Sequence, residues 1–271
     1  MSSTATFSRR VSALRQWRGF VLGAAVRELR ARYARSLFGW IWLIVPPAVL
    51  IGIYTLVFSR MTRGAGLPDH GPYTYSIFLC AGMLTWQWFS ELATRVVGLF
   101  TNNATLLKKT PTPWYALLAV EIVVTTAGLA IQMALFALLL ALAGHWPGWN
   151  WLLMLPLLAA QGMFAIGLAL GLAVFQVFLR DVGLTVPLVL QVWFWLTPIV
   201  YPASALPESY RHLLDLNLMT PIVQGYQSAV LFDGAGIDWR GAAFVAVLGA
   251  AAFLGSIRLV RRNLPAMRDE F

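Results

Sequence analysis

The side chains most able to do chemistry are few in this sequence, and their spacing indicates neither an active site nor a metal site. Its histidines are His70, His145 and His212, and none stands near a cysteine or a second histidine at metal-ligand spacing. His212 and Asp215 form an HxxD pair, which is commoner on a solvated helix face than around a metal. We therefore predict no catalytic residue and no metal ligand.

Nucleotide and thiol chemistry are also poorly represented. The sequence has no G-x-x-x-x-G-K-[ST] phosphate loop, so we expect no cofactor in this chain and any ATP to bind elsewhere. Cys80 is the only cysteine and lies in an apolar run, where a small buried side chain is the expected role.

The composition is that of a membrane protein. Hydrophobic residues make up 59% of the 271 and charged residues only 11%, with a mean hydropathy of +0.71; charged residues are nearer a quarter of a soluble domain. Six runs are long and apolar enough for helices that cross a hydrocarbon core about 30 Å thick. They are residues 37–59, 73–94, 114–143, 151–177, 183–201 and 241–257. We predict an all-α integral membrane protein with six transmembrane helices.

The basic residues set the expected orientation. The net charge is +9, and the basic residues border apolar spans instead of forming a soluble patch, so we expect no nucleic-acid partner. With the N-terminus inside, all but four of the 20 Lys and Arg residues fall on the inner side. Because cytoplasmic loops are enriched in Lys and Arg, we predict a multi-pass membrane protein with both termini in the cytoplasm. The exceptions are Arg60, Arg63, Arg211 and Arg240.

Three predicted parts follow from these spans: a basic cytoplasmic segment over 1–36, a transmembrane domain over 37–257 and a cytoplasmic tail over 258–271. The first part contains an apolar stripe before the first span, which predicts an amphipathic helix lying at the membrane interface. The stripe consists of Leu22, Val26, Leu29 and Tyr33. Glu28 and Arg32 can pair along this helix. A plain basic anchor to anionic lipid is the alternative.

A few charges lie near the inner ends of the spans. Glu91 and Arg95 are at i and i+4 in the second span, and Glu121 lies in the third within reach of Arg95, Lys108 or Lys109. Ionisable residues within a membrane are functional candidates. Their position near the surface favours a structural ion pair.

The outer segment 202–236 is long and partly apolar. Two short helices fit, about 207–215 and 221–232, each with a proline at its start. Neither can span a bilayer, so we predict a re-entrant helical hairpin before the last span, with a surface loop as the alternative. In the fourth span, Gly167 and Gly171 have a GxxxG spacing, which predicts the close approach of another helix.

Aromatic residues recur within the predicted spans. Flat rings can stack on sugars without fixing their register, so these residues are candidates to line a conduit. They are Tyr54, Phe58, Trp86, Phe89, Trp193, Trp195 and Tyr201. Packing against protein or lipid is the alternative for each ring. If they line a conduit, alanine at Trp86 or Phe89 should slow passage through it without reducing protein abundance.

Five stretches together resemble the membrane subunit of ABC exporters that move polysaccharides or polyol-phosphate polymers. They are RELRARYARSLFGWIWLIVPP, NNATLLKKTPTP, VFLRDVG, VLQVWFWLTPIVYP and LNLMTPIVQGYQ, in this order between Arg27 and the last span. The resemblance implies a homodimer of this chain with two copies of a separate cytoplasmic ATP-binding subunit, which would hold ATP and Mg. It also implies a lipid-linked glycan substrate and a place in the bacterial cytoplasmic (inner) membrane, with membrane lipids around the spans.

The resemblance also implies roles for particular residues. Contacts with the ATP-binding subunit would come from the basic helix, the inner loop of about 96–113 and the second inner turn, and the outer gate would come from 202–236. The implied contact residues are Arg27, Arg30, Arg35, Asn103, Lys108, Lys109, Arg180 and Asp181, and the implied gate residues are Leu216, Met219, Pro221 and Tyr226. The chain departs from the family pattern at Leu218, Gln224 and Gln227, where a proline and a charged pair are common.

Two other functions fit the same pattern less closely. One is an ABC exporter of drugs or simple lipids, which the partner ATPase and neighbouring genes would distinguish. The other is an intramembrane enzyme acting on lipid-linked sugars, which should be active without an ATPase.

Overall fold

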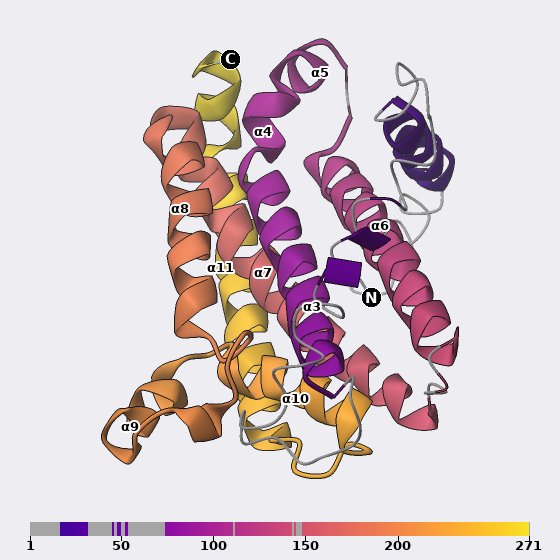
Figure 1. Cartoon of the computed structure of the whole chain (residues 1–271). Helices are drawn as coiled ribbons and strands as arrows, with labels where there is room; N and C mark the ends of the chain where they lie inside the picture. The colour runs from indigo at the N-terminus through magenta and orange to yellow at the C-terminus, as the bar shows by residue number, and fades with distance from the viewer. Residues whose placement is uncertain are drawn as a thin grey trace, which may run out of the picture.

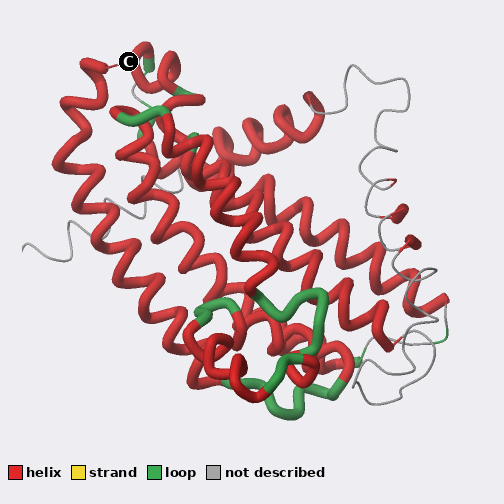
Figure 2. The backbone as a smooth tube through the Cα atoms, turned by 60° about the vertical axis from the view of Figure 1, so that its left-hand side comes forward, coloured by secondary structure: helices red, strands yellow, loops and turns green. Residues whose placement is uncertain are grey.

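The computed structural model describes residues 17–31, 74–110, 112–142 and 148–270, together with 45, 48–49, 52–53 and 144. Every regular element in these ranges is a helix (Figure 2). The all-helical class predicted from the sequence is therefore confirmed for the described residues. Most of the predicted first span lies outside them, as do Arg35, Tyr54 and Phe58.

After a helical segment over residues 17–31, which we call segment 17–31, the described helices follow in chain order (Figure 1). They are α3 (Thr74–Val97), α4 (Leu99–Asn102), α5 (Ala104–Lys109), α6 (Trp114–Leu142), η1 (Trp149–Leu153), α7 (Met154–Phe178), α8 (Asp181–Leu196), η2 (Ala203–Ala205), α9 (Glu208–Leu216), α10 (Thr220–Leu231) and α11 (Trp239–Glu270).

Three stretches among the described residues have the length and hydropathy of membrane spans: Trp114–Leu142, Trp149–Phe178 and Trp239–Met267. Helix α8 is apolar but has only 16 residues. Helix α3 has 24 residues, a length of about 36 Å at 1.5 Å per residue, and carries polar side chains in its second half. It runs beside the long apolar helices and contacts α6, α7, α8 and α10.

The long helices run between two ends of the bundle (Figure 1). One end carries α4, α5 and the C-terminal turns of α11; we call it the α5 end. The other carries α9 and α10; we call it the α10 end. The two helices expected over 207–215 and 221–232 are present as α9 and α10. Helix α10 packs against α3 and α7, whereas α9 lies at the margin of the bundle (Figure 1).

Glycines hold α7 and α11 unusually close together. A Cβ built on Gly167 would lie 2.4 Å from the Gly249 carbonyl oxygen, and one on Gly249 would lie 2.5 Å from the Phe164 amide nitrogen. The Ser256 hydroxyl donates a hydrogen bond of 2.7 Å to the Gly167 carbonyl across this contact. The close approach predicted from Gly167 and Gly171 is confirmed, and α11 is the partner helix.

Segment 17–31 crosses the α5 end instead of running along the bundle (Figure 2). Ala25 packs into a small apolar cluster with Val120 and Val124 of α6, and all three are buried. Leu22 and Val26, from the predicted apolar stripe, are 60% and 44% exposed. One side of the segment therefore rests on α6, and an apolar side is left uncovered by the described protein.

Candidate functional site

A groove between α3 and α8 combines polar and aromatic side chains. Its volume is about 370 Å³, and its walls come from one face of each helix. On α3 the lining residues recur at i, i+3 or i+4 and i+7, the spacing of a single helical face. The groove is lined by Met83, Trp86, Gln87, Ser90, Thr94, Pro187, Leu190, Gln191 and Phe194. We call it the polar groove.

The polar groups of this groove are uncharged amides and hydroxyls. Gln87, Ser90 and Thr94 come from α3, and Gln191 faces them from α8. Such side chains both donate and accept hydrogen bonds, as sugar hydroxyls do. These four residues were not among the sequence-based candidates. Their spacing on a helix that is otherwise apolar is the signal that could have revealed them.

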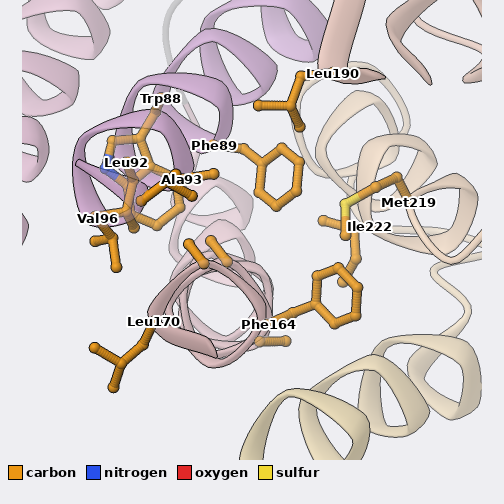
Figure 3. Close-up of a cluster of buried hydrophobic side chains, with 14 of the residues drawn as sticks. Trp88, Phe89, Leu92, Ala93, Val96, Phe164, Leu170, Leu190, Met219 and Ile222 are labelled. Carbon is orange, nitrogen blue, oxygen red and sulfur yellow. The ribbon is translucent and has the colours of Figure 1, made fainter. Parts of the chain in front are cut away.

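A second cavity lies on the other side of the α3–α8 contact. It has a volume of about 410 Å³ and is walled almost entirely by apolar side chains of α3, α7 and α8. Leu190 lines both this cavity and the polar groove. Figure 3 shows Leu190 and Phe89 pointing toward each other where α8 meets α3. Helices α3 and α8 therefore contribute side chains to a polar groove and to an apolar cavity, and Leu190 borders both.

Three of the predicted conduit aromatics meet in one packed cluster. The ring centroids of Trp86 and Trp193 are 6.0 Å apart, and those of Phe89 and Trp193 are 5.9 Å apart. Trp86 and Phe89 are only 5% and 1% exposed. Phe164 and Phe194, which were not candidates, complete the cluster. The rings meet because α3, α7 and α8 converge here.

The other two described aromatic candidates lie outside this cluster. Trp195 is 61% exposed. The Tyr201 hydroxyl donates a hydrogen bond of 3.3 Å to the backbone carbonyl of Trp195. Tyr201 lies beyond the end of α8, which ends at Leu196.

At the α5 end, Arg95 of α3 joins two carboxylates from different elements. Its Nε donates to Glu121 Oε2 of α6 at 2.6 Å, and its Nη2 pairs with Glu28 of segment 17–31. The sequence left Arg95, Lys108 and Lys109 open as partners of Glu121, and the structure pairs it with Arg95. The pair with Glu28 was not expected, since Glu28 was assigned to Arg32, which lies outside the described residues.

The described residues expected to contact an ATP-binding subunit all lie at the α5 end. Arg27, Arg30, Lys108, Lys109, Arg180 and Asp181 are exposed there. Asn103 is partly buried, and its side chain donates a hydrogen bond of 2.9 Å to the Leu99 carbonyl at the end of α4.

The inner loop is held by contacts within the chain. Gln176 of α7 donates a hydrogen bond of 3.3 Å to the Thr101 hydroxyl, which joins the loop to the end of α7, just before α8. Helix α11 also contacts α5, and Leu107, Val260 and Met267 are buried in the same apolar core.

The expected gate residues differ in burial. Met219 and Tyr226 are fully buried, Pro221 is half-buried and Leu216 is 77% exposed. The Tyr226 hydroxyl donates 2.8 Å to Gln161 of α7, which fixes α10 inside the bundle. The gate residues are therefore divided between the packed α10 and the exposed end of α9.

Asn217, between α9 and α10, is a residue that the sequence-based candidates missed. Its Oδ1 accepts hydrogen bonds from Trp193 Nε1 at 2.8 Å and from the Met219 amide at 3.0 Å. Its Nδ2 donates 3.0 Å to the Leu196 carbonyl at the end of α8. One side chain thus joins the end of α8 to the start of α10.

Three stretches long and apolar enough to cross a membrane define a multi-pass membrane protein, and α3 and α8 form a polar groove beside them. Residues 21–231 match the ABC-2 type transporter family, and the chain belongs to that family. This confirms the family resemblance found in the sequence motifs. The protein is accordingly a membrane permease subunit of a transporter.

Its relatives include permeases of surface-polysaccharide export. The chain is 31% identical over 222 residues to the O-antigen export system permease protein RfbA of Myxococcus xanthus, which covers 81% of this chain and 83% of that protein. It is 25% identical over 232 residues to the RfbA permease of Klebsiella pneumoniae, with 85% of each chain covered. The polysialic acid transport protein KpsM of Escherichia coli is 22% identical over 211 residues, with 76% and 79% covered.

Proposed function

We propose that this chain is the transmembrane subunit of an ATP-driven exporter of a lipid-linked polysaccharide. Two copies of the chain would form a conduit across the inner membrane, and two copies of a separate cytoplasmic subunit would bind ATP and Mg. The observation that carries the proposal is the polar groove, because it places amides, hydroxyls and aromatic edges together at the level of the spanning helices. Sugars offer hydroxyls for the former and C–H faces for the latter.

The exposure of α8 supports a conduit made by two copies. Leu190 is the only residue of α8 that is buried. Leu184, Leu188, Val192 and Trp195 are each more than half exposed. A helix that forms one wall of an open groove, and that the described part of the chain leaves largely uncovered, suits a position where a second copy closes the path.

The distribution of charge supports a cytoplasmic α5 end. This end carries the exposed basic residues Lys108, Lys109, Arg258, Arg261 and Arg262, whereas Arg211 and Arg240 are the basic residues that the structure describes at the α10 end. By the positive-inside rule, both termini would be cytoplasmic. We propose six spans, with segment 17–31 at the inner interface and α9–α10 as a re-entrant hairpin that gates the outer mouth. The burial of α10 between α3 and α7 supports that gate.

The proposal is tested by deleting the gene and complementing the deletion with the intact chain. Loss of surface glycan should be accompanied by lipid-linked polymer trapped in the cytoplasmic leaflet, because synthesis continues while export stops. Labelled glycan in the inner leaflet and on the surface would be quantified separately. Normal surface glycan in the deletion strain would refute the proposal.

The proposed contact with the ATP-binding subunit gives a second test. Lys108 and Lys109 lie in the last turn of α5 and are exposed. Replacing both by Glu reverses two charges, so co-purification of the ATP-binding subunit should fall by about tenfold, the effect of roughly 1.4 kcal/mol. Arg240→Glu, at the opposite end of the bundle, is the matched control. Undiminished co-purification and export in the double variant would exclude α5 from the interface.

Export of a simple lipid or drug is the second candidate, favoured by the apolar cavity beside α8. In that case the deletion strain should keep its surface glycan and instead become sensitive to the drug or retain the lipid. The same strain therefore discriminates between the two functions.

A further inference from the structure

Arg95 stands where three elements meet at the α5 end. Its guanidinium comes from α3, and the carboxylates of Glu28 and Glu121 come from segment 17–31 and α6. The side chains of Arg95, Glu28 and Glu121 are 20%, 33% and 13% exposed, so each is largely shielded from water. A guanidinium has a planar fork of donors and can hold two carboxylates at once, which a single ammonium does less well.

Apolar packing supports the same junction. Ala25 is 2% exposed, Val120 6% and Val124 1%, and they form one cluster between segment 17–31 and α6. Charged and apolar contacts together give segment 17–31 two different attachments to the same part of the bundle. Separating the segment from α6 would therefore expose apolar surface and leave Arg95 with one partner fewer.

Helix α3 connects this charged junction to the polar groove. Thr94, the residue before Arg95, lines the polar groove. Gln87 and Ser90 line the same groove about two turns and one turn earlier on α3. Helix α3 thus carries the charged junction on one face and the groove wall on another. A displacement of segment 17–31 that α3 must follow will move the groove wall relative to α8, in which only Leu190 is buried among the described residues.

We propose that Arg95 is a positioning residue that fastens segment 17–31 to α3 and α6, so that these three elements move as one body and set the width of the polar groove. The role in export rests on the proposed function. The fastening itself is a property of the chain and can be measured without any glycan.

The first experiment separates ATP hydrolysis from export. Arg95→Gln removes two charge-assisted hydrogen bonds, so glycan export should fall by about tenfold or more, while the co-purified ATP-binding subunit hydrolyses ATP at near its normal rate. Glu28→Gln should have a larger effect than Glu121→Gln, because α3 and α6 also touch directly. Arg95→Lys should restore export in part. Arg18→Gln removes a positive charge from an exposed position of the same segment and is the control.

A purely structural role for Arg95 predicts a different result. Protein abundance, ATP hydrolysis and export would then fall together, and the proposal would be wrong. The variant E28R/R95E/E121Q restores a single pair between positions 28 and 95 with reversed charges. It should recover export relative to R95E, and failure to recover despite normal abundance would also contradict the proposal.

The second experiment measures the fastening directly. Cys80 is the only cysteine, so Cys80→Ala gives a cysteine-free background. Ala25→Cys with Val124→Cys should form a disulfide cross-link under mild oxidation, because both positions lie in one buried cluster, and the yield should drop several-fold when Arg95→Gln is added. An unchanged yield would show that Arg95 does not hold the segment.

Transport by the cross-linked proteins completes the test. The 25–124 cross-link joins parts of one body and should leave export near normal, whereas a cross-link between Gln87→Cys and Gln191→Cys across the polar groove should stop it. If the 25–124 cross-link blocks export as fully as the 87–191 cross-link, the segment moves against α6 and the proposal fails. If deletion of the gene leaves glycan export intact, the proposed function fails, and the cross-linking yield still reports on the fastening.

Discussion

Gly249→Ala should remove most of the folded protein from the membrane, although it adds only one methyl group. A Cβ at this position would lie 2.5 Å from the amide nitrogen and 2.6 Å from the Cα of Phe164. Non-bonded carbon atoms prefer about 3.5–4.0 Å, and backbone atoms cannot rotate away as a side chain can. The α7–α11 contact must therefore open, at a cost of about 3 kcal/mol, the upper end for overpacked cores.

The measurement is the amount of monodisperse protein in detergent and its thermal unfolding midpoint. Gly255→Ala on the same helix is the matched control, because a Cβ there meets nothing within 4 Å. Alanine also favours a helix over glycine by about 1 kcal/mol, so this control should be as abundant as the natural protein or more so. Equal abundance of the two variants would show that α7 and α11 do not need this close approach.

The glycines of the α7–α11 contact show which part of it can be predicted from the sequence. Gly167 and Gly171 predict that another helix approaches closely, because their spacing places both on one face of the helix. The sequence does not say which helix approaches, because that depends on how the helices are arranged in space. Gly249 then acquires its role from its position opposite Phe164.

The end of α8 is another feature that the sequence predicted only in part. The apolar run predicted a span over 183–201, but the helix ends at Leu196 and Thr197 has an extended backbone, with φ −98° and ψ 138°. The reason lies in Pro198, since a proline disfavours helical conformation in the residue before it. Hydropathy alone extended the span past a boundary that backbone sterics determine.

The aromatic residues show what helical periodicity leaves open. Trp86 and Phe89 share a face of α3, as expected, but periodicity cannot say what covers that face. The structure packs them against Trp193, and both are nearly inaccessible. Truncating a buried aromatic ring costs about 3–5 kcal/mol, so alanine at either position should lower abundance as well as export. This differs from the effect expected from the sequence.

The two ion pairs of Arg95 differ in how far apart their partners lie in the sequence. Arg95 and Glu121 are close enough along the chain, across one inner loop, for their pairing to be expected. Arg95 and Glu28 are 67 residues apart, and only the docking of segment 17–31 on α6 brings them together. Local pairing rules such as i and i+4 favoured Arg32 for Glu28, and tertiary packing adds Arg95 as its partner.

Ser90→Trp should reduce glycan export by about tenfold or more, equivalent to at least 1.4 kcal/mol, while protein abundance stays near normal. Ser90 lines the polar groove and is only partly buried, so an indole ring there enters the open groove instead of the packed core. Ser90→Ala removes one hydroxyl without filling space. Because a single hydrogen bond contributes about 1 kcal/mol, this variant should lose export no more than about fivefold.

A matched bulky variant distinguishes obstruction of the groove from a general effect of tryptophan. Leu184 lies on the same helix as Gln191 but is 78% exposed and lines neither cavity, so Leu184→Trp adds the same ring away from the path. Export of labelled glycan, normalised to permease abundance, should be blocked in Ser90→Trp and retained in Leu184→Trp. Normal export by an abundant Ser90→Trp protein would mean that polymer does not pass between α3 and α8, and that the polar groove has another role. Because the three variants separate the space in the groove from its hydrogen bonds, they also show which of the two limits transport.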